Sequence, residues 1–328
     1  MATKLSVGIN GAGRFGLHLL QYWIEHQDSA LFAINYINDS LLTSENIETI
    51  IKGDKYLRLR DYVSLDNNYL LVHFPTKIHR IKLTRSDLLD IAWLGKPDIF
   101  LECSGKHAND TELTNVNTGN TRKTIISATS WAADEILVVG YNHAAHKNTP
   151  VVSYGSCTVN AYIPLAHMID ARFGVVDSDV NIIHNVPVHH LENFHTIERR
   201  ECTLALVAPH LLNFINEDNF SVNYSLVPYD GVSVMDFRFR LRDIVNRQQA
   251  VSTIRKEINE GSLNELYELT LSDTGPEPHK FTKASAVLVE SSIVLKGDNL
   301  YFQAYFDNEN SVNRYYDLIN YFCLEESQ

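Results

Sequence analysis

The sequence is poor in cysteine, and its cysteines lie far apart. Only four occur among the 328 residues, at Cys103, Cys157, Cys202 and Cys323. No Cys-x-x-Cys pair is present, so neither a structural zinc site nor a disulfide framework is predicted, and we expect no bound metal. A few scattered cysteines are typical of proteins from a reducing compartment. We therefore expect a cytoplasmic location.

Long apolar runs are also missing. No stretch approaches the roughly 18 apolar residues that a membrane-spanning helix needs, so no membrane association is expected. The start of the chain lacks the apolar core of a secretory signal peptide.

The chain has fewer basic than acidic residues, with 28 Lys and Arg against 40 Asp and Glu. The resulting net charge of −12 argues against a nucleic-acid-binding surface, but not against a local pocket for one anionic small molecule.

A glycine-rich turn follows the first predicted strand. Lys4–Ile9 alternates polar and apolar residues and leads into Gly11-Ala12-Gly13-Arg14-Phe15-Gly16, after which a helix is predicted. In such a turn the first glycine allows the tight bend, the second lets the backbone approach a pyrophosphate, and the third lets the helix pack on the strand. The pattern predicts a dinucleotide site. The alternative is a tight turn without a ligand.

The second predicted strand, Leu31–Ile37, ends at Asn38-Asp39. A carboxylate at this place accepts hydrogen bonds from the adenosine ribose and repels a 2′-phosphate, which favours NAD over NADP. The sequence of this half also predicts helix Thr43–Lys52, strands Tyr69–Phe74 and Ile78–Leu83, a helix capped by Ser86, and strands Asp98–Glu102, Lys123–Ser127, Ile136–Val139 and Pro150–Ser153. Because ligands lie beyond the carboxyl ends of parallel strands, Ser104, Gly105 and Ser127 are candidates to line the cofactor site.

The pattern changes after Cys157. Longer alternating strands are predicted at Val176–Asn185, Phe220–Val227, Ser233–Leu241, Ser285–Leu295 and Asn299–Asp307, with helices at Gln248–Glu260 and Ser311–Phe322. A length of 328 residues exceeds what one core usually supports. The predicted fold is therefore α/β plus α+β, a Rossmann-type nucleotide-binding domain at 1–155 followed by a mostly antiparallel-sheet catalytic domain at 156–310.

Cys157 is placed where a helix is expected to begin. Backbone N–H groups and the helix dipole at such an end favour a thiolate over a thiol, and Ser156 and Thr158 flank it with hydroxyls that could hold an anion. The alternative is an inert, buried cysteine. His184, near the end of an apolar strand, is a candidate base for this thiol, with His189, His190 and His195 as competitors on the following loop.

Several blocks together resemble the glyceraldehyde-3-phosphate dehydrogenases, nearly from end to end. The blocks are Val7–Gly16, Ile37–Asp39, Ile125–Ala128, Ser156–Asn160, Val227-Pro228, Val232–Asp236, Asp307–Glu309 and Asn313-Arg314. The resemblance implies NAD as cofactor, an aldehyde and inorganic phosphate as partners, and a homo-oligomer. It also implies that the C-terminal helix 311–328 packs on the nucleotide-binding domain.

The resemblance also implies roles for individual residues. Cys157 would be the nucleophile and His184 its base. The cofactor-binding set would be Gly11, Gly13, Arg14 and Phe15 at the pyrophosphate, Asp39 at the ribose, Ser104 and Ser127 along the site, and Asn308 at the nicotinamide carboxamide. The attacking phosphate would bind at Ser156, Thr158 and Thr203. Cys157 would form a thiohemiacetal and then a thioester with the aldehyde, and phosphate would release an acyl phosphate.

The chain departs from the family pattern around the phosphate. The family's arginine before the Val-Pro block is Leu226, its lysine after the phosphate-site threonine is Val207, and the loop between His184 and Thr203 is shorter. Leucine cannot replace a bidentate arginine–phosphate contact. Arg199 and Arg200 could supply the missing charge or form a solvated pair. Three hypotheses therefore stand: a phosphorylating NAD-dependent dehydrogenase of glyceraldehyde 3-phosphate or a relative, a dehydrogenase for another aldehyde or acceptor, and an NAD-binding protein with weak catalysis.

Overall fold

The computed structural model describes residues 4–54, 57–186, 191–192, 196–228, 232–243, 245–307 and 311–326. The chain divides into two compact units, each described by itself below. The first unit consists of Met1–Leu137, His143–Gly155 and Val312–Gln328, and the second of Val138–Asn142 and Ser156–Ser311. Within the described parts of the chain, no helix is both long and apolar enough to cross a membrane.

A parallel-rich sheet forms the first unit. In sheet order its strands are β3 (Val63–Asp66), β4 (Tyr69–Phe74), β5 (Lys77–Thr84), β2 (Phe32–Asn38), β1 (Leu5–Asn10), β6 (Ile99–Glu102), β7 (Lys123–Ile126), β9 (Val151–Ser153) and β8 (Glu135–Ile136). Only the β3–β4 and β4–β5 pairs are antiparallel, and the remaining described pairs are parallel. The carboxyl ends of β1, β2, β6 and β7 therefore meet at one edge, where ligands of such sheets bind.

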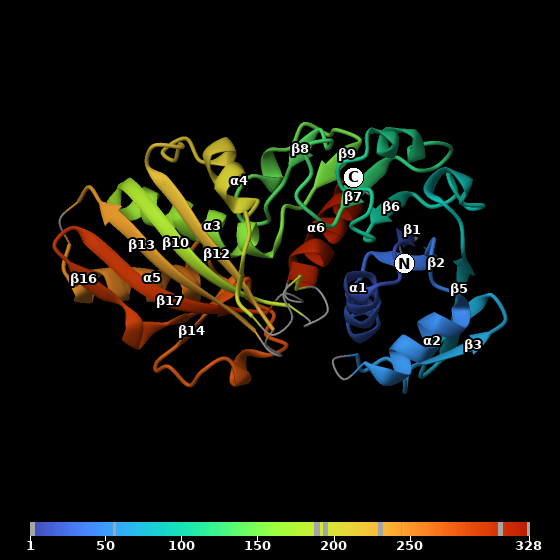
Figure 1. The fold of residues 1–328 in the computed structure, drawn as a ribbon. Helices are drawn as coiled ribbons and strands as arrows, with labels where there is room; N and C mark the ends of the chain where they lie inside the picture. The colour runs from blue at the N-terminus through green and yellow to red at the C-terminus, as the bar shows by residue number, and fades with distance from the viewer. Residues whose placement is uncertain are drawn as a thin grey trace. The chain divides into compact units, whose positions relative to one another are not determined.

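Helix α1 (Arg14–Glu25) and the C-terminal helix α6 (Ser311–Glu325) lie together in this unit (Figure 1). Tyr315 of α6 packs edge-on against Phe15 with ring centroids 5.3 Å apart, and its hydroxyl donates to the Ile125 carbonyl at 2.5 Å. The Tyr316 ring packs edge-on against the Tyr22 ring of α1, with ring centroids 4.9 Å apart. Helix α2 (Ser44–Gly53) begins with a capping box between Thr43 and Asn46.

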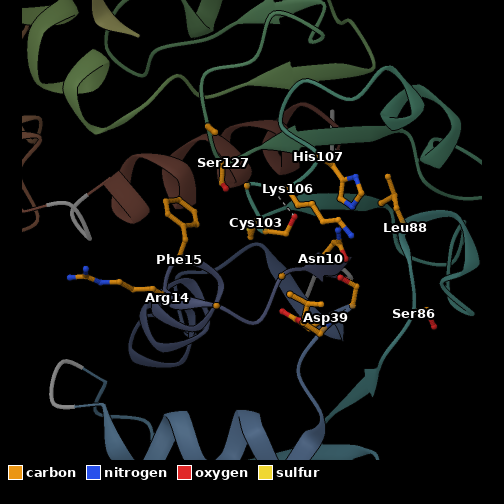
Figure 2. Close-up of a pocket in the computed structure, with 17 residues that line it drawn as sticks. Asn10, Arg14, Phe15, Asp39, Ser86, Leu88, Cys103, Lys106, His107 and Ser127 are labelled. Carbon is orange, nitrogen blue, oxygen red and sulfur yellow. Dashed lines mark hydrogen bonds between the residues drawn. The ribbon is translucent and has the colours of Figure 1, made fainter. Parts of the chain in front are cut away.

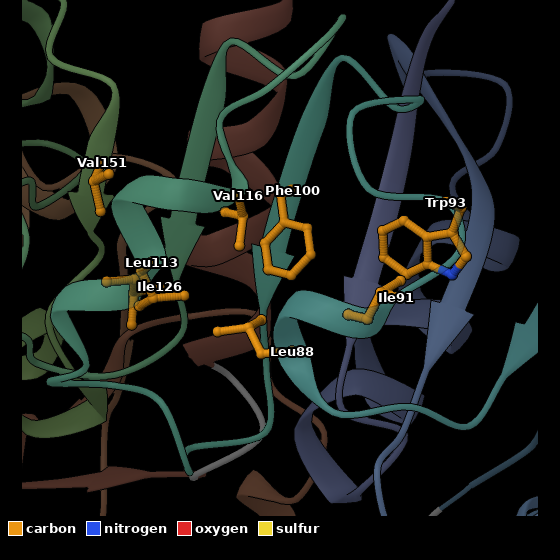
Figure 3. Close-up of a cluster of buried hydrophobic side chains, with 8 residues drawn as sticks. All are labelled: Leu88, Ile91, Trp93, Phe100, Leu113, Val116, Ile126 and Val151. Atoms are coloured by element: carbon orange, nitrogen blue, oxygen red, sulfur yellow. The ribbon is translucent and has the colours of Figure 1, made fainter.

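A cluster of buried apolar side chains packs against this sheet. Its members are Leu88, Ile91, Trp93, Phe100, Leu113, Val116, Ile126 and Val151 (Figure 3). Phe100, Ile126 and Val151 come from β6, β7 and β9, whereas the others come from the connections between strands. Trp93 also fills the space above Gly8, where any added Cβ would lie 2.4 Å from the indole ring. Two short 3-10 helices, Leu88–Asp90 and Thr111–Val116, thus contribute side chains to this core.

A mostly antiparallel sheet forms the second unit. In sheet order its strands are β11 (Glu198–Arg199), β12 (Phe220–Val227), β10 (Val175–Asn185), β13 (Ser233–Leu241), β17 (Asn299–Phe306), β15 (Ala286–Val289) and β14 (Tyr267–Thr270), with β16 (Val294–Lys296) paired to β17. The helices are α3 (Cys157–Phe173), α4 (Leu204–Leu211) and α5 (Arg247–Glu260). These two sheets confirm the predicted fold class.

The two faces of the second sheet differ in polarity. Helices α3 and α5 cover one face (Figure 1), where Tyr162 packs against Phe237 and Phe239. The opposite face carries an ion-pair network in which Arg238 and Arg240 contact Asp177 at 2.8 and 2.6 Å. Alternation along β10 and β13 produces this division, because neighbouring residues of a strand point to opposite faces.

Three elements were predicted with the wrong length or the wrong type of secondary structure. The strand predicted at Ser285–Leu295 is two strands, β15 and β16, separated by a 3-10 helix at Glu290–Ser292. Ser292 explains the break, because its hydroxyl donates to the Val289 carbonyl and accepts from Gln303 N, which interrupts the strand ladder. The helix predicted after Ser86 is a single 3-10 turn, Leu88–Asp90. The strand predicted at Ile136–Val139 is the two-residue β8, since the chain leaves the first unit after Leu137.

Candidate active site

The three glycines of the turn between β1 and α1 differ in the space around them. Gly11 has φ of 111°, and a Cβ there would lie 2.4 Å from the Ser104 nitrogen. A Cβ on Gly16 would lie 2.0 Å from the Gly11 carbonyl oxygen. A Cβ on Gly13, by contrast, would meet no atom within 4 Å. Gly13 is also the N-cap of α1 and offers no side-chain cap, so the helix end faces open space of the kind a phosphate group occupies.

A cavity of about 380 Å³ lies at this edge of the sheet (Figure 2). All of the cofactor-binding residues predicted in the first unit line it: Gly11, Gly13, Arg14, Phe15, Asp39, Ser104 and Ser127. Gly105, the other candidate, lines it as well. Sequence reasoning missed Asn10, Lys106 and His107, which also line the cavity. His107 Nδ1 lies 3.0 Å from Asp110 Oδ2.

Asp39 ties the glycine turn to the loop after β2. Its Oδ2 accepts a hydrogen bond from Ala12 N at 2.9 Å, and its Oδ1 accepts from Leu41 N and Leu42 N, each at 2.9 Å. A carboxylate has about four acceptor positions, so these three bonds leave capacity for one more, on Oδ2. The carboxylate therefore has a structural role in addition to any contact with a ribose.

A buried polar network lies beneath the cavity. Glu102 is 1% exposed and accepts from Asn10 Nδ2 at 2.6 Å and from Ser104 N at 2.7 Å. Asn38 Nδ2 donates to Asn10 Oδ1 at 2.8 Å. Burial raises the pKa of Glu102, while the hydrogen bonds from Ser104 and Asn10 oppose that rise. The Ser104 hydroxyl, predicted to line the site, also donates to Glu102, so it is oriented by the network.

Cys157 is the first residue of α3, at the place where the sequence predicts the beginning of a helix. Ser156 is the N-cap, and its hydroxyl accepts from Val159 N at 3.4 Å. Cys157 Sγ lies 3.5 Å from Nε2 of His184 on β10. The structure therefore brings together the predicted nucleophile and the predicted base, residues 27 positions apart in the chain.

The other three cysteines are buried, whereas Cys157 is partly exposed. Burial raises the pKa of Cys323 to about 12, and burial also raises the pKa of Cys103 and of Cys202. A thiol must lose its proton to act as a nucleophile. The buried thiols are therefore poor nucleophiles at neutral pH, and Cys157 is the cysteine available for chemistry.

The predicted phosphate-site hydroxyls lie near the start of α3. Ser156 Oγ and Thr158 Oγ1 are 3.1 Å apart, and Thr158 Oγ1 is 3.6 Å from Cys202 Sγ. Thr203 follows Cys202 directly and is exposed at the start of α4. Arg200 donates through Nε to Glu198 at 2.5 Å, so its positive charge is paired with a carboxylate.

Leu226 and Val207 are both buried. Leu226 is aligned with His184 in the parallel β10–β12 ladder and with Glu198 in the β11–β12 ladder. The position beside the predicted base is thus apolar. Asn308, predicted at the nicotinamide, and the competitors His189, His190 and His195 lie outside the described residues. Among the described residues, no cluster of His, Cys, Asp or Glu could hold a metal ion.

Known proteins share sequence similarity with this chain. No protein-family model matches the chain. Glyceraldehyde-3-phosphate dehydrogenase 1 of Caenorhabditis elegans is 33% identical over 190 residues, which cover 56% of this chain and 54% of the relative. The chain thus matches about half the length of that protein. Cytosolic glyceraldehyde-3-phosphate dehydrogenase of Pisum sativum is 26% identical over 330 residues, covering 94% of this chain and 95% of the relative.

The chain is a distant relative of these proteins. The relationship fits a fold with a parallel-rich sheet followed by a mostly antiparallel one. A similar match, 26% over 328 residues, links the chain to the cytosolic glyceraldehyde-3-phosphate dehydrogenase of Dianthus caryophyllus.

Proposed function

We propose that this protein is an NAD-dependent aldehyde dehydrogenase that works through a covalent intermediate on Cys157. The observation that carries the proposal is the 3.5 Å approach of Cys157 Sγ to His184 Nε2 at the N-terminus of α3. A nucleophile next to a base, with the helix dipole favouring the thiolate, is the arrangement that covalent catalysis by cysteine requires. In this proposal residues 1–155, completed by 311–328, hold the cofactor, and residues 156–310 carry the chemistry.

The two residues act in turn on the substrate carbon. The Cys157 thiolate adds to the aldehyde carbonyl carbon, and the oxyanion that forms takes a proton from the protonated His184 imidazole to give a thiohemiacetal. His184 Nε2 takes the hydroxyl proton of this adduct as its carbon is oxidised, and a thioester on Cys157 results. Attack of the acceptor on that thioester breaks the carbon–sulfur bond and restores the thiolate.

The first unit fits NAD as the cofactor. Gly11, Gly13, Arg14 and Phe15 would hold its pyrophosphate, and Asp39 its adenosine ribose. The open space at Gly13 and the carboxylate of Asp39 at the same cavity support this assignment. NAD supplies the hydride acceptor when bound. Ser104 and Ser127 would line the site, and Asn308 would contact the carboxamide.

The proposed substrate is glyceraldehyde 3-phosphate or a related phosphorylated aldehyde, with inorganic phosphate as acceptor. The relatives' names and the hydroxyls of Ser156, Thr158 and Thr203 support this choice. Arg200 would contribute charge at the same place. A second candidate, another aldehyde or acceptor, is favoured by the buried Leu226 and by the pairing of Arg200 with Glu198. We further propose a cytoplasmic homo-oligomer.

The test is NADH formation from a panel of phosphorylated and unphosphorylated aldehydes, each with and without inorganic phosphate. We expect phosphate-dependent turnover of glyceraldehyde 3-phosphate, and we expect Cys157→Ser to abolish it. Turnover of other aldehydes alone would support the second candidate. Absence of turnover from a protein that still binds NAD would refute the proposed catalysis and leave an NAD-binding protein.

A further inference from the structure

A proline interrupts the regular hydrogen bonding of the helix that begins at Cys157. Pro164 lies inside α3 and is buried. Proline has no N–H, so it cannot donate to the carbonyl four residues earlier, which is that of Asn160. Asn160 is only 2% exposed. A buried carbonyl that lacks its usual helical donor needs a hydrogen bond from another group.

A tyrosine on β14 supplies that donor. The Tyr267 hydroxyl lies 2.9 Å from the Asn160 carbonyl oxygen and 3.0 Å from the Ala161 carbonyl oxygen. A carbonyl oxygen can only accept, so the single phenolic proton is shared between the two. Tyr267 is 3% exposed, and its backbone N donates to the Leu263 carbonyl at 3.0 Å. The hydroxyl is therefore held in place on the first turns of α3.

The Asn160 peptide is in turn connected to the residue before Cys157. Asn160 N and Asn160 Nδ2 both donate to the Ser156 carbonyl, each at 2.9 Å. The carbonyl of Ser156 and the N–H of Cys157 belong to one planar peptide group. The two bonds from Asn160 therefore set the direction of an N–H at the helix end, where such groups and the helix dipole stabilise a thiolate.

The titratable groups near Cys157 come from other elements. They are His184 on β10, Tyr224 on β12, Cys202 before α4, and the ion pair of Glu198 and Arg200 at β11. Tyr267 touches α3 from β14 and binds only backbone carbonyls there. A substitution that removes its hydroxyl leaves each of these titratable groups in the chain, so its effect on Cys157 reports the position of the helix end.

We propose that Tyr267 is a positioning residue of this site, whose hydroxyl replaces the N–H that Pro164 lacks and holds the first turn of α3, with Cys157, against His184. The proposal rests on Cys157 being the nucleophile of the proposed function. Tyr267 acts through the backbone of α3 and takes no part in the chemical steps. Its role is to keep the sulfur within the 3.5 Å of Nε2 that the structure shows.

The test is the pH dependence of iodoacetamide alkylation of Cys157 in the full chain, measured by mass spectrometry without substrate or cofactor. Tyr267→Phe removes the hydroxyl and keeps the ring. We expect the midpoint of the alkylation profile to move up by about 0.5 pH unit, because a loosened first turn loses part of the helix-end stabilisation of the thiolate.

The matched control is Tyr141→Phe. It also removes a tyrosine hydroxyl that donates to a backbone carbonyl in the second unit, that of Leu211 at 2.5 Å. Leu211 lies at the end of α4, not in the first turns of α3. The control should leave the alkylation midpoint unchanged, even where it lowers the free energy of unfolding as much as Tyr267→Phe does.

Restoring an N–H at residue 164 gives a sharper comparison. Pro164→Ala provides the Asn160 carbonyl with its ordinary helical donor. In that background Tyr267→Phe should no longer move the midpoint, because the helix supplies the bond that the hydroxyl supplied before. A purely structural hydroxyl would instead change the stability in both backgrounds and the midpoint in neither.

An unchanged midpoint in folded Tyr267→Phe would overturn the proposal and leave the hydroxyl with a role in stability alone. An equal shift with and without Pro164→Ala would also overturn it. If Tyr267→Phe does not fold, Tyr267→Met, whose flexible side chain adapts to the same space, should give the same shift.

Alkylation needs neither turnover nor NAD, so this result stands apart from the test of the proposed function. If the wild type oxidises an aldehyde, Tyr267→Phe should also lower kcat about three- to tenfold with little change in KM, because misplacement of the nucleophile affects the chemical step more than binding. The same change in KM as in kcat would contradict a positioning role.

Discussion

At the scale of single residues, the distinctive feature is the difference between one cysteine and the other three. Cys103, Cys202 and Cys323 are buried packing residues, whereas Cys157 is partly exposed at a helix N-terminus and lies beside His184. The position of Cys157 between a predicted strand and a predicted helix indicated the helix N-terminus, and the family resemblance indicated His184 as its base. The sequence could not predict that the Tyr224 ring on β12 packs against the His184 imidazole, with centroids 5.5 Å apart, because such a contact depends on the strand register.

Replacing His184 tests its role as base. We expect His184→Ala to lower kcat by about 10²- to 10⁴-fold with a smaller effect on KM, because a base acts in the transition state rather than in binding. The measurement is steady-state kinetics with the best aldehyde of the panel. His210→Ala is the control, since His210 is an exposed histidine on α4 of the same unit. Retention of half the wild-type kcat by His184→Ala would rule out this role.

At the scale of elements, the turn between β1 and α1 contains two glycines that the fold requires and one whose predicted use is in binding. The sequence predicted its position and the uses of its three glycines. The structure adds that Gly11 and Gly16 are confined by neighbouring backbone, whereas Gly13 is not. The backbone of Gly13 is extended, with φ of −78° and ψ of −167°, which alanine also adopts.

A methyl group on Gly13 should therefore harm binding without harming the fold. We expect Gly13→Ala to change the free energy of unfolding by less than about 0.5 kcal/mol, yet to raise the Kd for NAD at least tenfold. Calorimetric titration and urea unfolding measure the two quantities. Gly53→Ala at the end of α2 is the control, because it also meets no atom within 4 Å but lies outside the lining of the cavity. Unchanged NAD affinity in Gly13→Ala would contradict the placement of the pyrophosphate.

At the scale of the whole molecule, the sequence predicted the two kinds of sheet because strand periodicity differs between the two halves. It also predicted β12 and β13 to the residue, and β10 and β17 to within one residue at one end. It missed β3, β11, β14 and α4. The short strands β11 and β14 exist because neighbouring strands supply their hydrogen bonds, which no local pattern records. The Asn10–Asn38–Glu102 network was missed for the same reason.

That network predicts a pH dependence of stability. Because burial raises the pKa of Glu102 in the folded state, its contribution is fully present below the ordinary glutamate value and is lost as pH rises through the raised value. We expect the free energy of unfolding of the wild type to fall relative to that of Glu102→Gln as the pH rises from the ordinary glutamate pKa to the raised pKa of Glu102. Urea unfolding at several pH values measures it.

Glu260→Gln, at an exposed position at the end of α5, is the control for removing one carboxylate charge from the same protein. Groups common to both proteins cancel in each comparison. A pH-independent difference for Glu102→Gln would mean that this carboxyl titrates in the folded protein as it does in the unfolded chain.

Helix α6 gives the chain an unusual order of assembly during synthesis. Its residues from Val312 onward belong to the first unit, although every residue of the second unit is translated before them. Tyr315 and Tyr316, which pack on α1, leave the ribosome some 290 residues after that helix. The surface of α1 that α6 covers therefore stays uncovered until the second unit has been translated, so synthesis completes the first unit last.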